Sequence, residues 1–205
     1  MEKFTNLKSI PSYLSLQNID TDMIIPKQFL KTIKRTGLGK SLFYEMRYDE
    51  NGKVITDFIL NKEPYNKSRI LLAGKNFGCG SSREHAVWAI QNYGIDVVIA
   101  ESFADIFSRN SFKNGLLLIT LESQTINEII DSSLSSNSYI LDVNLTEDKI
   151  LLPNDKTITF SISRSYKDRI INELDDIELT LRNKDQIKNY ENQMKLSKPW
   201  LFNND

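Results

Sequence analysis

Short apolar runs alternate with stretches of helical spacing through the middle of the chain. The apolar runs that indicate buried strands are residues 70–73, 95–100 and 116–120. The stretches with helical spacing are residues 84–93, 102–113 and 124–134. Gly94 is placed to cap the first of these helices, and Ile126, Ile129 and Ile130 fall on one face of the third. The order β-α-β-α-β-α predicts an α/β core.

Shorter elements are predicted after this core. Strand-like segments occur at residues 139–145, 149–152 and 157–162. A helical candidate near residues 166–174 is followed by a polar helix over roughly residues 183–195. The pattern therefore predicts one compact unit over residues 1–205, an α/β core with β-rich flanks and a helical tail from about residue 183.

Composition and charge exclude several classes of function. The 205 residues include 40% hydrophobic and 26% charged residues, and no apolar run approaches the about 20 residues that a membrane span needs. The N-terminus lacks the pattern of a secretory signal, so we expect a cytoplasmic location. The 26 basic and 27 acidic residues nearly balance, and there is no long basic block, which argues against nucleic-acid binding.

A glycine-rich stretch between the first predicted core strand and helix is the strongest candidate for chemistry. Gly78 and Gly80 let the backbone turn sharply and bring amide groups close to a ligand. Ser81 begins a Ser-x-x-Glu capping pattern, which would put Ser81, Ser82 and Arg83 at the positive end of a helix dipole. Arg83 could bind a carboxylate bidentately, and nearby amides could stabilise a deprotonated Ser81 as a base. An isolated Ser-x-x-Glu pattern would indicate only a cap, but the glycines and the adjacent arginine favour a functional site at Ser81.

The single cysteine and the single histidine limit the alternatives. Cys79 has no second cysteine for a disulfide, and alone it cannot form a four-cysteine zinc or iron–sulfur site. We interpret it as a small buried residue, and we expect no metal site on this chain. His85 falls on the helix just past the serines, and no Gly-x-Ser-x-Gly elbow is present, so the serines are not hydrolase-like.

The same stretch, NFGCGSSREHA, resembles the signature of the swivelling domain of the aconitase family. The resemblance implies a single swivelling β/β/α domain like domain 4 of aconitase. It implies Ser81 as the catalytic base and Arg83 as the group that binds a substrate carboxylate. Ser82 would help to hold the substrate or the serine alkoxide, while Glu84 and His85 are interpreted as structural.

A second stretch, residues 18–37, resembles the N-terminal motif of the small subunits of 3-isopropylmalate dehydratase, one branch of that family. The resemblance implies that Asp22 pairs with a histidine on a cluster-bearing partner. It also makes Arg35 the candidate for a second carboxylate-binding arginine. Without the resemblance, Asp20 and Asp22 would be interpreted as part of a turn or a helix cap. Lys31, Lys34 and Arg35 would be interpreted as a solvated face.

The resemblance also identifies a specificity loop, formed by Phe29, Leu30, Lys31 and Thr32. In this family the loop separates substrates by the group beside the hydroxyl-bearing carbon. Phe29 and Leu30 would suit an isopropyl group, whereas homoaconitase-like relatives place an arginine there.

The implied activity is that of a hydro-lyase in leucine biosynthesis, which interconverts 2-isopropylmalate and 3-isopropylmalate through 2-isopropylmaleate. This chemistry needs a base, cationic groups for the carboxylates and a Lewis acid for the departing oxygen. By the resemblance, this chain supplies the first two, and a separate large subunit holds a [4Fe–4S] cluster, in a heterodimer or higher assembly. Alternatives are the small subunit of a citraconate, homoaconitate or dimethylmalate hydro-lyase, or a non-catalytic carboxylate-binding module.

Overall fold

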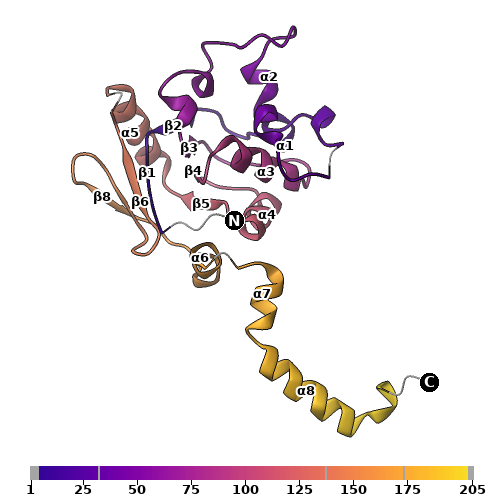
Figure 1. Cartoon of the computed structure of the whole chain (residues 1–205). Helices are drawn as coiled ribbons and strands as arrows, with labels where there is room; N and C mark the ends of the chain where they lie inside the picture. The colour runs from indigo at the N-terminus through magenta and orange to yellow at the C-terminus, as the bar shows by residue number, and fades with distance from the viewer. Residues whose placement is uncertain (1–4, 32, 137, 173, 203–205) are drawn as a thin grey trace.

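The computed structural model describes residues 5–31, 33–136, 138–172 and 174–202 (Figure 1). The strands are β1 (Asn6–Ser9), β2 (Pro11–Leu14), β3 (Ile70–Ala73), β4 (Val97–Ala100), β5 (Leu117–Thr120), β6 (Leu141–Asn144), β7 (Lys149–Leu151) and β8 (Thr157–Thr159). The α-helices are α1 (Thr21–Ile24), α2 (Tyr44–Arg47), α3 (Glu84–Tyr93), α4 (Asp105–Asn114), α5 (Ser123–Leu134), α6 (Arg164–Ile171), α7 (Asp176–Leu181) and α8 (Lys184–Ser197). The 3-10 turns are η1 (Lys27–Phe29), η2 (Leu38–Ser41), η3 (Ile59–Asn61), η4 (Tyr65–Lys67) and η5 (Pro199–Leu201).

A parallel sheet with strand order β2-β3-β4-β5 forms the centre of the fold. The predicted β-α-β-α-β-α order is confirmed, because β3, α3, β4, α4, β5 and α5 follow one another along the chain. Every residue of β3 and β4 is buried, as their unbroken apolar sequences require. Strand β2 was not predicted, because its four residues include a proline and two polar or aromatic residues instead of an apolar run.

An antiparallel sheet with order β1-β6-β7-β8 forms a second layer. The three strand segments predicted after the core are confirmed, although each is shorter than expected. One buried cluster joins alternate residues of the parallel sheet, such as Leu72 and Ile99, with Val143 and Ile150 of the antiparallel sheet and with α5 and α6. The predicted β/β/α architecture is therefore confirmed.

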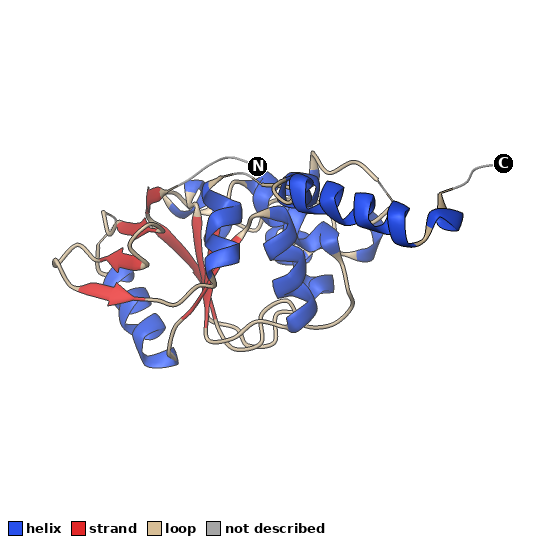
Figure 2. Cartoon of the chain, turned by 90° about the horizontal axis from the view of Figure 1, so that it is seen from below, coloured by secondary structure: helices blue, strands red, loops and turns tan. Residues whose placement is uncertain are grey.

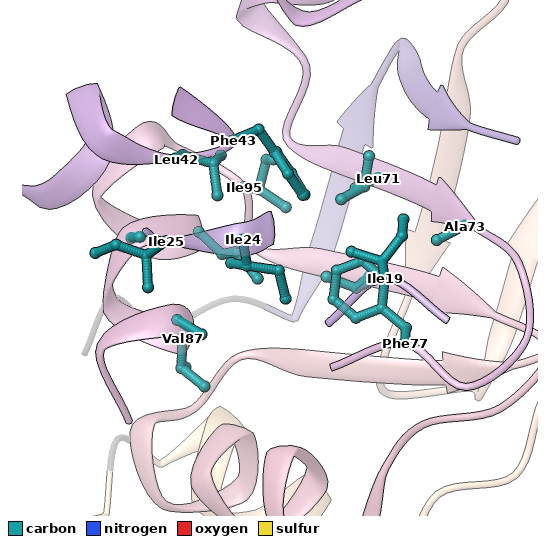
Figure 3. Close-up of a cluster of buried hydrophobic side chains, with 14 of the residues drawn as sticks. Ile19, Ile24, Ile25, Leu42, Phe43, Leu71, Ala73, Phe77, Val87 and Ile95 are labelled. Atoms are coloured by element: carbon teal, nitrogen blue, oxygen red, sulfur yellow. The ribbon is translucent and has the colours of Figure 1, made fainter. Parts of the chain in front are cut away.

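A second buried cluster covers the opposite face of the parallel sheet (Figure 3). Leu71 and Ala73 point to this side because successive strand residues alternate between faces. Ile19, Ile24 and Phe77 pack here with them, and each is at most 1% exposed. Full burial of such a side chain contributes about 1.5–3 kcal/mol. These anchors fix the two loops that carry the candidate site.

The C-terminal part of the chain is helical. Helices α6 and α8 confirm the two helical predictions, with bounds shifted by a few residues, whereas α7 was not predicted. Figures 1 and 2 show α8 extending away from the two sheets. Within the described ranges, no helix has both the length and the apolar character needed to cross a membrane.

Candidate functional site

Loops that follow β2, β3 and β4 meet at the carboxyl edge of the parallel sheet. The backbone amide of Gly78 donates to Ile19 at 2.7 Å, and the amide of Phe77 donates to Ser102 at 3.0 Å. The loop after β3 is therefore held between its two neighbours, as a continuation of the sheet. The carboxyl edge is where open parallel sheets generally bind ligands.

Gly78 is required by the close packing of this loop. Its φ of +77° is in the left-handed region, and a Cβ atom there would lie 2.2 Å from Cγ of Phe107. Gly80 has a φ of +89° and faces Asp20, whose Cβ would be 3.4 Å from an added Cβ. The sharp turn predicted from these glycines is thus present, and it brings the loop against the segment after β2.

Ser81 and Ser82 are exposed at the end of this loop. The prediction that Ser81 caps the helix is wrong, because α3 begins at Glu84 and its N-cap residue is Arg83, which makes no side-chain capping bond. Instead, the hydroxyl of Thr21 donates to the carbonyl oxygen of Ser81 at 3.0 Å. This tertiary contact fixes the backbone of Ser81 without using the Ser81 hydroxyl.

Arg83 and Asp22 form an ion pair between the two loops. Nη1 of Arg83 lies 2.5 Å from Oδ1 of Asp22, and the two side chains are 11% and 42% exposed. The hydrogen bond from Arg83 lowers the pKa of Asp22 below its ordinary 3.8, helped by the charges of Arg83 and Lys27 and opposed by burial. Asp20 caps α1 by accepting from the amide of Met23 at 2.7 Å, so the helix-cap reading holds for Asp20. Two predicted site residues are therefore in direct contact.

Arg35 lies elsewhere. Its guanidinium stacks over the ring of Trp88 on α3, 5.3 Å from the ring centre, and the residue is exposed. Arg35 and Trp88 line an open groove of about 1030 Å³, together with Lys113 and Asn114 of α4. The structure thus unites Ser81, Ser82 and the Asp22–Arg83 pair at one edge, and it places Arg35 on the side of α3.

The specificity loop is only partly described. Phe29 and Leu30 are half-buried against the core cluster, and the Phe29 ring lies 4.9 Å from that of Tyr44. Lys31 is exposed. Thr32 lies outside the described residues.

Glu84 and His85 make packing contacts on α3. Oε1 of Glu84 accepts from the side-chain amide of Asn114 at 2.8 Å, which ties α3 to α4. The His85 ring lies 4.7 Å from that of Trp88. Both contacts agree with the structural roles predicted for these residues.

Cys79 has the environment of an inactive thiol. Burial, and then the charge of Asp20, raise the pKa of the Cys79 thiol, and Sγ contacts the carbonyl oxygen of Asn18 at 3.4 Å. The side chain is half-buried, not fully buried as predicted, because the loop is at the edge of the sheet. Within the part of the chain that the structure describes, no three His, Cys, Asp or Glu residues are grouped to hold a metal ion.

Two parts of the site were not foreseen from the sequence. Thr21 holds the Ser81 carbonyl, and Asp22 binds Arg83 directly across 61 positions of sequence. No local spacing signals such contacts.

Comparisons with known proteins assign the family. A model of the aconitase C-terminal domain matches residues 1–124, and a model of the C-terminal domain of the 3-isopropylmalate dehydratase small subunit matches residues 176–204. A 3-isopropylmalate dehydratase small subunit of Pelagibacter ubique is 56% identical over 203 residues, covering 99% of this chain and 98% of that protein. The protein of the same name from Rhodospirillum rubrum is 53% identical over 201 residues, covering 98% and 97%.

A solved structure agrees with this assignment. The crystal structure of 3-isopropylmalate dehydratase from Methanocaldococcus jannaschii is 30% identical with a TM-score of 0.64, over 90% of this chain and 99% of that one. Sequence and fold point to the same group of proteins, and the chain belongs to the family of 3-isopropylmalate dehydratase small subunits, built on the aconitase C-terminal domain.

Proposed function

We propose that the chain works as the small subunit of a 3-isopropylmalate dehydratase, a hydro-lyase of leucine biosynthesis that interconverts 2-isopropylmalate and 3-isopropylmalate through 2-isopropylmaleate. One observation supports this most directly. A chain that matches a named small subunit over 99% of its length presents an exposed Ser81 two positions before the anchored Arg83, at the carboxyl edge of its parallel sheet.

Ser81 is the proposed base. The reaction removes a proton from a carbon beside a carboxylate, which requires a base within hydrogen-bond reach of that proton. The Ser81 backbone is fixed by Thr21, and its side chain is exposed and does not cap α3. Ser81 also lies just before the positive end of α3, which favours the alkoxide form. Ser82, exposed beside it, would help to hold the substrate or the alkoxide.

Arg83 is the proposed carboxylate-binding group. A guanidinium has five N–H donors in a planar fork, so Nη1 can remain on Asp22 while other donors bind a substrate carboxylate. Arg83 is only 11% exposed, which limits its rotamers and fixes the direction of the fork. Asp22 is thereby a positioning residue for Arg83.

Asp22 is also placed to contact the large partner. A carboxylate has two oxygen atoms, and Oδ1 accepts from Arg83. With 42% of its side chain exposed, Asp22 can accept from a histidine of the large subunit through its other oxygen. One carboxylate would then connect the substrate-binding arginine to the interface between the subunits.

The Lewis acid belongs to the partner in this proposal. A [4Fe–4S] cluster with an open iron, when bound on the large subunit, would accept the departing hydroxyl oxygen. This chain does not fit a cluster, because it has one cysteine and the pKa of that thiol is raised. The chain would act in a heterodimer or a higher assembly, and we expect that assembly in the cytoplasm.

Arg35 and the specificity loop complete the proposed substrate contacts. Phe29 and Leu30 provide apolar surface that suits an isopropyl group, and Lys31 and Thr32 belong to the same loop. Arg35, the proposed second carboxylate-binding residue, would have to leave Trp88 or bind substrate from that position. Its exposure makes either movement inexpensive, because an exposed cation–π contact contributes only about 0.5–1 kcal/mol.

The test is an anaerobic assay of the chain co-expressed with the large subunit of the same organism, following the absorbance of 2-isopropylmaleate. Ser81→Ala should reduce kcat by about 10²–10⁴, the usual contribution of a general base. Its melting temperature should hardly change, because exposed substitutions generally alter stability by less than about 0.5 kcal/mol. Ser161→Ala, at another exposed serine, is the matched control and should leave both quantities unchanged.

Near-normal turnover of Ser81→Ala would reject the assigned base. Turnover of citraconate or dimethylmalate in preference to isopropylmalate would reject the assigned substrate and leave the reaction class standing.

A further inference from the structure

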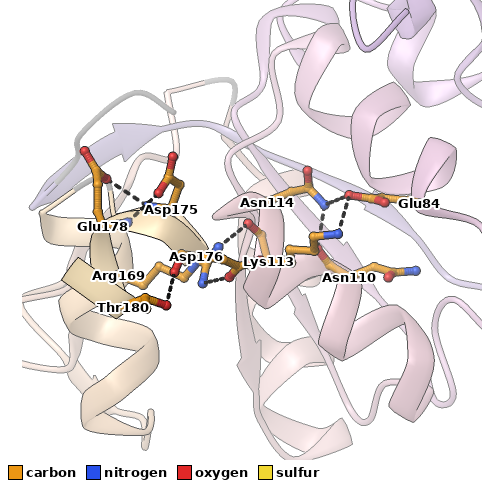
Figure 4. A network of polar contacts seen from close by, with 9 residues as sticks. All are labelled: Glu84, Asn110, Lys113, Asn114, Arg169, Asp175, Asp176, Glu178 and Thr180. Carbon is orange, nitrogen blue, oxygen red and sulfur yellow. Dashed lines mark hydrogen bonds and ion pairs between the residues drawn. The ribbon is translucent and has the colours of Figure 1, made fainter. Parts of the chain in front are cut away.

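The C-terminal helices begin from a rigid base. Arg169 on α6 is 2% exposed, and its Nη1 donates to Asp176 at the start of α7 at 2.7 Å (Figure 4). Its Nη2 donates to the carbonyl oxygen of Lys113 at 2.9 Å, and the guanidinium lies over the ring of Phe112 at 5.2 Å. A capping box closes the N-terminus of α7. The start of α7 is thus fixed to α4 and α6.

Beyond this base the chain forms an arm, defined here as residues 176–202. Every residue of α8 is exposed except Met194, which is half-buried. An isolated helix of this length is marginally stable in water, and helices in proteins depend on packing of an apolar face. A surface outside the described part of this chain would therefore stabilise α8.

The exposed apolar side chains of the molecule are concentrated on this arm. Of the 15 large exposed hydrophobic residues among those described, eight lie in it: Ile177, Leu181, Ile187, Tyr190, Leu196, Trp200, Leu201 and Phe202. Ile187, Tyr190 and Met194 are spaced by three and four residues, so they form one stripe along α8. This spacing is typical of a helix that binds in an apolar groove.

We propose that the arm docks on the large subunit through this stripe and through the aromatic end at Trp200. The inference rests on the proposed function, because that function requires a large subunit and the arm is the surface assigned to bind it. The aconitase domain model covers residues 1–124 and is named for the C-terminal domain of aconitase. The arm matches a separate model, named for the small subunit. The arm therefore lies outside the matched aconitase domain, in a part of the chain named for the small subunit, and that name implies a large partner.

Charge argues against a second copy of the chain as the occupant. Residues 182–202, which contain α8 and the aromatic end, include five basic and two acidic side chains, a net charge of +3, and the two acidic residues of α7 reduce the net charge of the whole arm to +1. Two arms packed stripe to stripe would bring these like charges together, which opposes association. The surface that fits the arm is an apolar groove with acidic residues at its rim.

The test compares two double variants of the full-length chain that add the same charge to α8. Ile187→Glu with Tyr190→Glu places both glutamates on the stripe, and Asn189→Glu with Asn192→Glu places them on the opposite face. Binding to the purified large subunit is measured by calorimetry, and each free chain is sized by light scattering. The stripe variant should bind about tenfold or more weakly, since central apolar contacts dominate interface affinity. The opposite-face variant should bind within about twofold of wild type.

The melting temperature of each variant serves as the control for folding. It should match that of wild type because α8 belongs to neither buried core cluster. Equal binding by all three chains would overturn the arm as a docking element while leaving the proposed function intact. A wild-type dimer that the stripe variant dissociates would overturn the large subunit as the occupant. If wild type itself failed to bind the large subunit, the proposed function would fail first, and this inference with it.

Discussion

Replacing Asp22 by asparagine tests whether the contact between the two site loops positions Arg83. The change keeps the size and one acceptor oxygen of the side chain, but it removes the charge that lies 2.5 Å from Nη1 of Arg83. In the proposed assembly, where the partner would cover the site, the loss of a charge-assisted hydrogen bond should cost about 1.5–3 kcal/mol. If Asp22 aligns the guanidinium, kcat/KM should fall about tenfold to a hundredfold.

Stability of the free chain should change much less. Asp22 is 42% exposed, so solvent screens the pair, and exposed ion pairs contribute about 0.2–1 kcal/mol. For a chain of 205 residues this corresponds to a fall in melting temperature of at most about 4 °C. The activity loss should therefore exceed what unfolding explains.

The pH dependence has a definite sign. The pKa of Asp22 is below its ordinary 3.8 in the folded chain, so its stabilising contribution is present above pH 3.8 and is lost as the pH falls through the lowered value. Asparagine does not titrate. The difference in melting temperature between wild type and Asp22→Asn should be constant near neutral pH and should shrink below pH 3.8.

The measurements are steady-state kinetics of the reconstituted enzyme and melting curves of the free chains. Asp57→Asn is the matched control, because Asp57 pairs with Lys62 at 3.5 Å but is 96% exposed and belongs to neither site loop. This control should change neither kinetics nor stability appreciably. A kcat/KM of Asp22→Asn within twofold of wild type would refute the positioning role.

Three further outcomes are expected. Gly78→Ala should destabilise the chain by several kcal/mol, because the added Cβ would lie 2.2 Å from Phe107. Gly37→Ala, at a similar φ but with open space around it, should cost only about 1–2 kcal/mol. Chemical denaturation measures the free energy of unfolding of both variants. Arg35→Lys should reduce kcat/KM about tenfold to a hundredfold while Lys34→Ala should not, and the reverse result would shift the assignment by one residue. The purified chain alone should be colourless and inactive, and addition of the large subunit should restore turnover without metal binding to this chain.

The central elements were predictable because their signals are local. The apolar runs of β3 and β4 are buried on both faces, and a glycine ends α3. The local sequence therefore marks where these two strands lie and where this helix ends. Strands β1 and β2 have four residues each and no apolar run, and only their pairing with distant strands makes them strands. Helix α7 has a local signal, the capping box of Asp175 and Glu178, but its six residues are too few to show a helical period.

Within the candidate site, the residue types were predictable but their contacts were not. The Ser-x-x-Glu pattern placed the start of the helix at Ser81, but α3 begins at Glu84, and the contact that fixes Ser81 is a hydrogen bond from Thr21 to its carbonyl oxygen. The pairing of Asp22 with Arg83 spans 61 positions and arises only when β2 and β3 lie side by side. A motif can identify the groups, but the sheet determines which of them meet.

The exposure of the site gives a physical reason for a divided enzyme. Ser81 and Ser82 are exposed in the free chain, and in water an alkoxide gains little from a helix dipole because solvent screens it. The same dipole and the Arg83 guanidinium stabilise charge much more strongly once water is excluded. Arg83 is already only 11% exposed and fixed on Asp22, so part of the required desolvated geometry exists before assembly. In the proposed assembly the partner would have two tasks, to provide the Lewis acid and to exclude water from Ser81, and a metal ion added to the free chain would accomplish only the first.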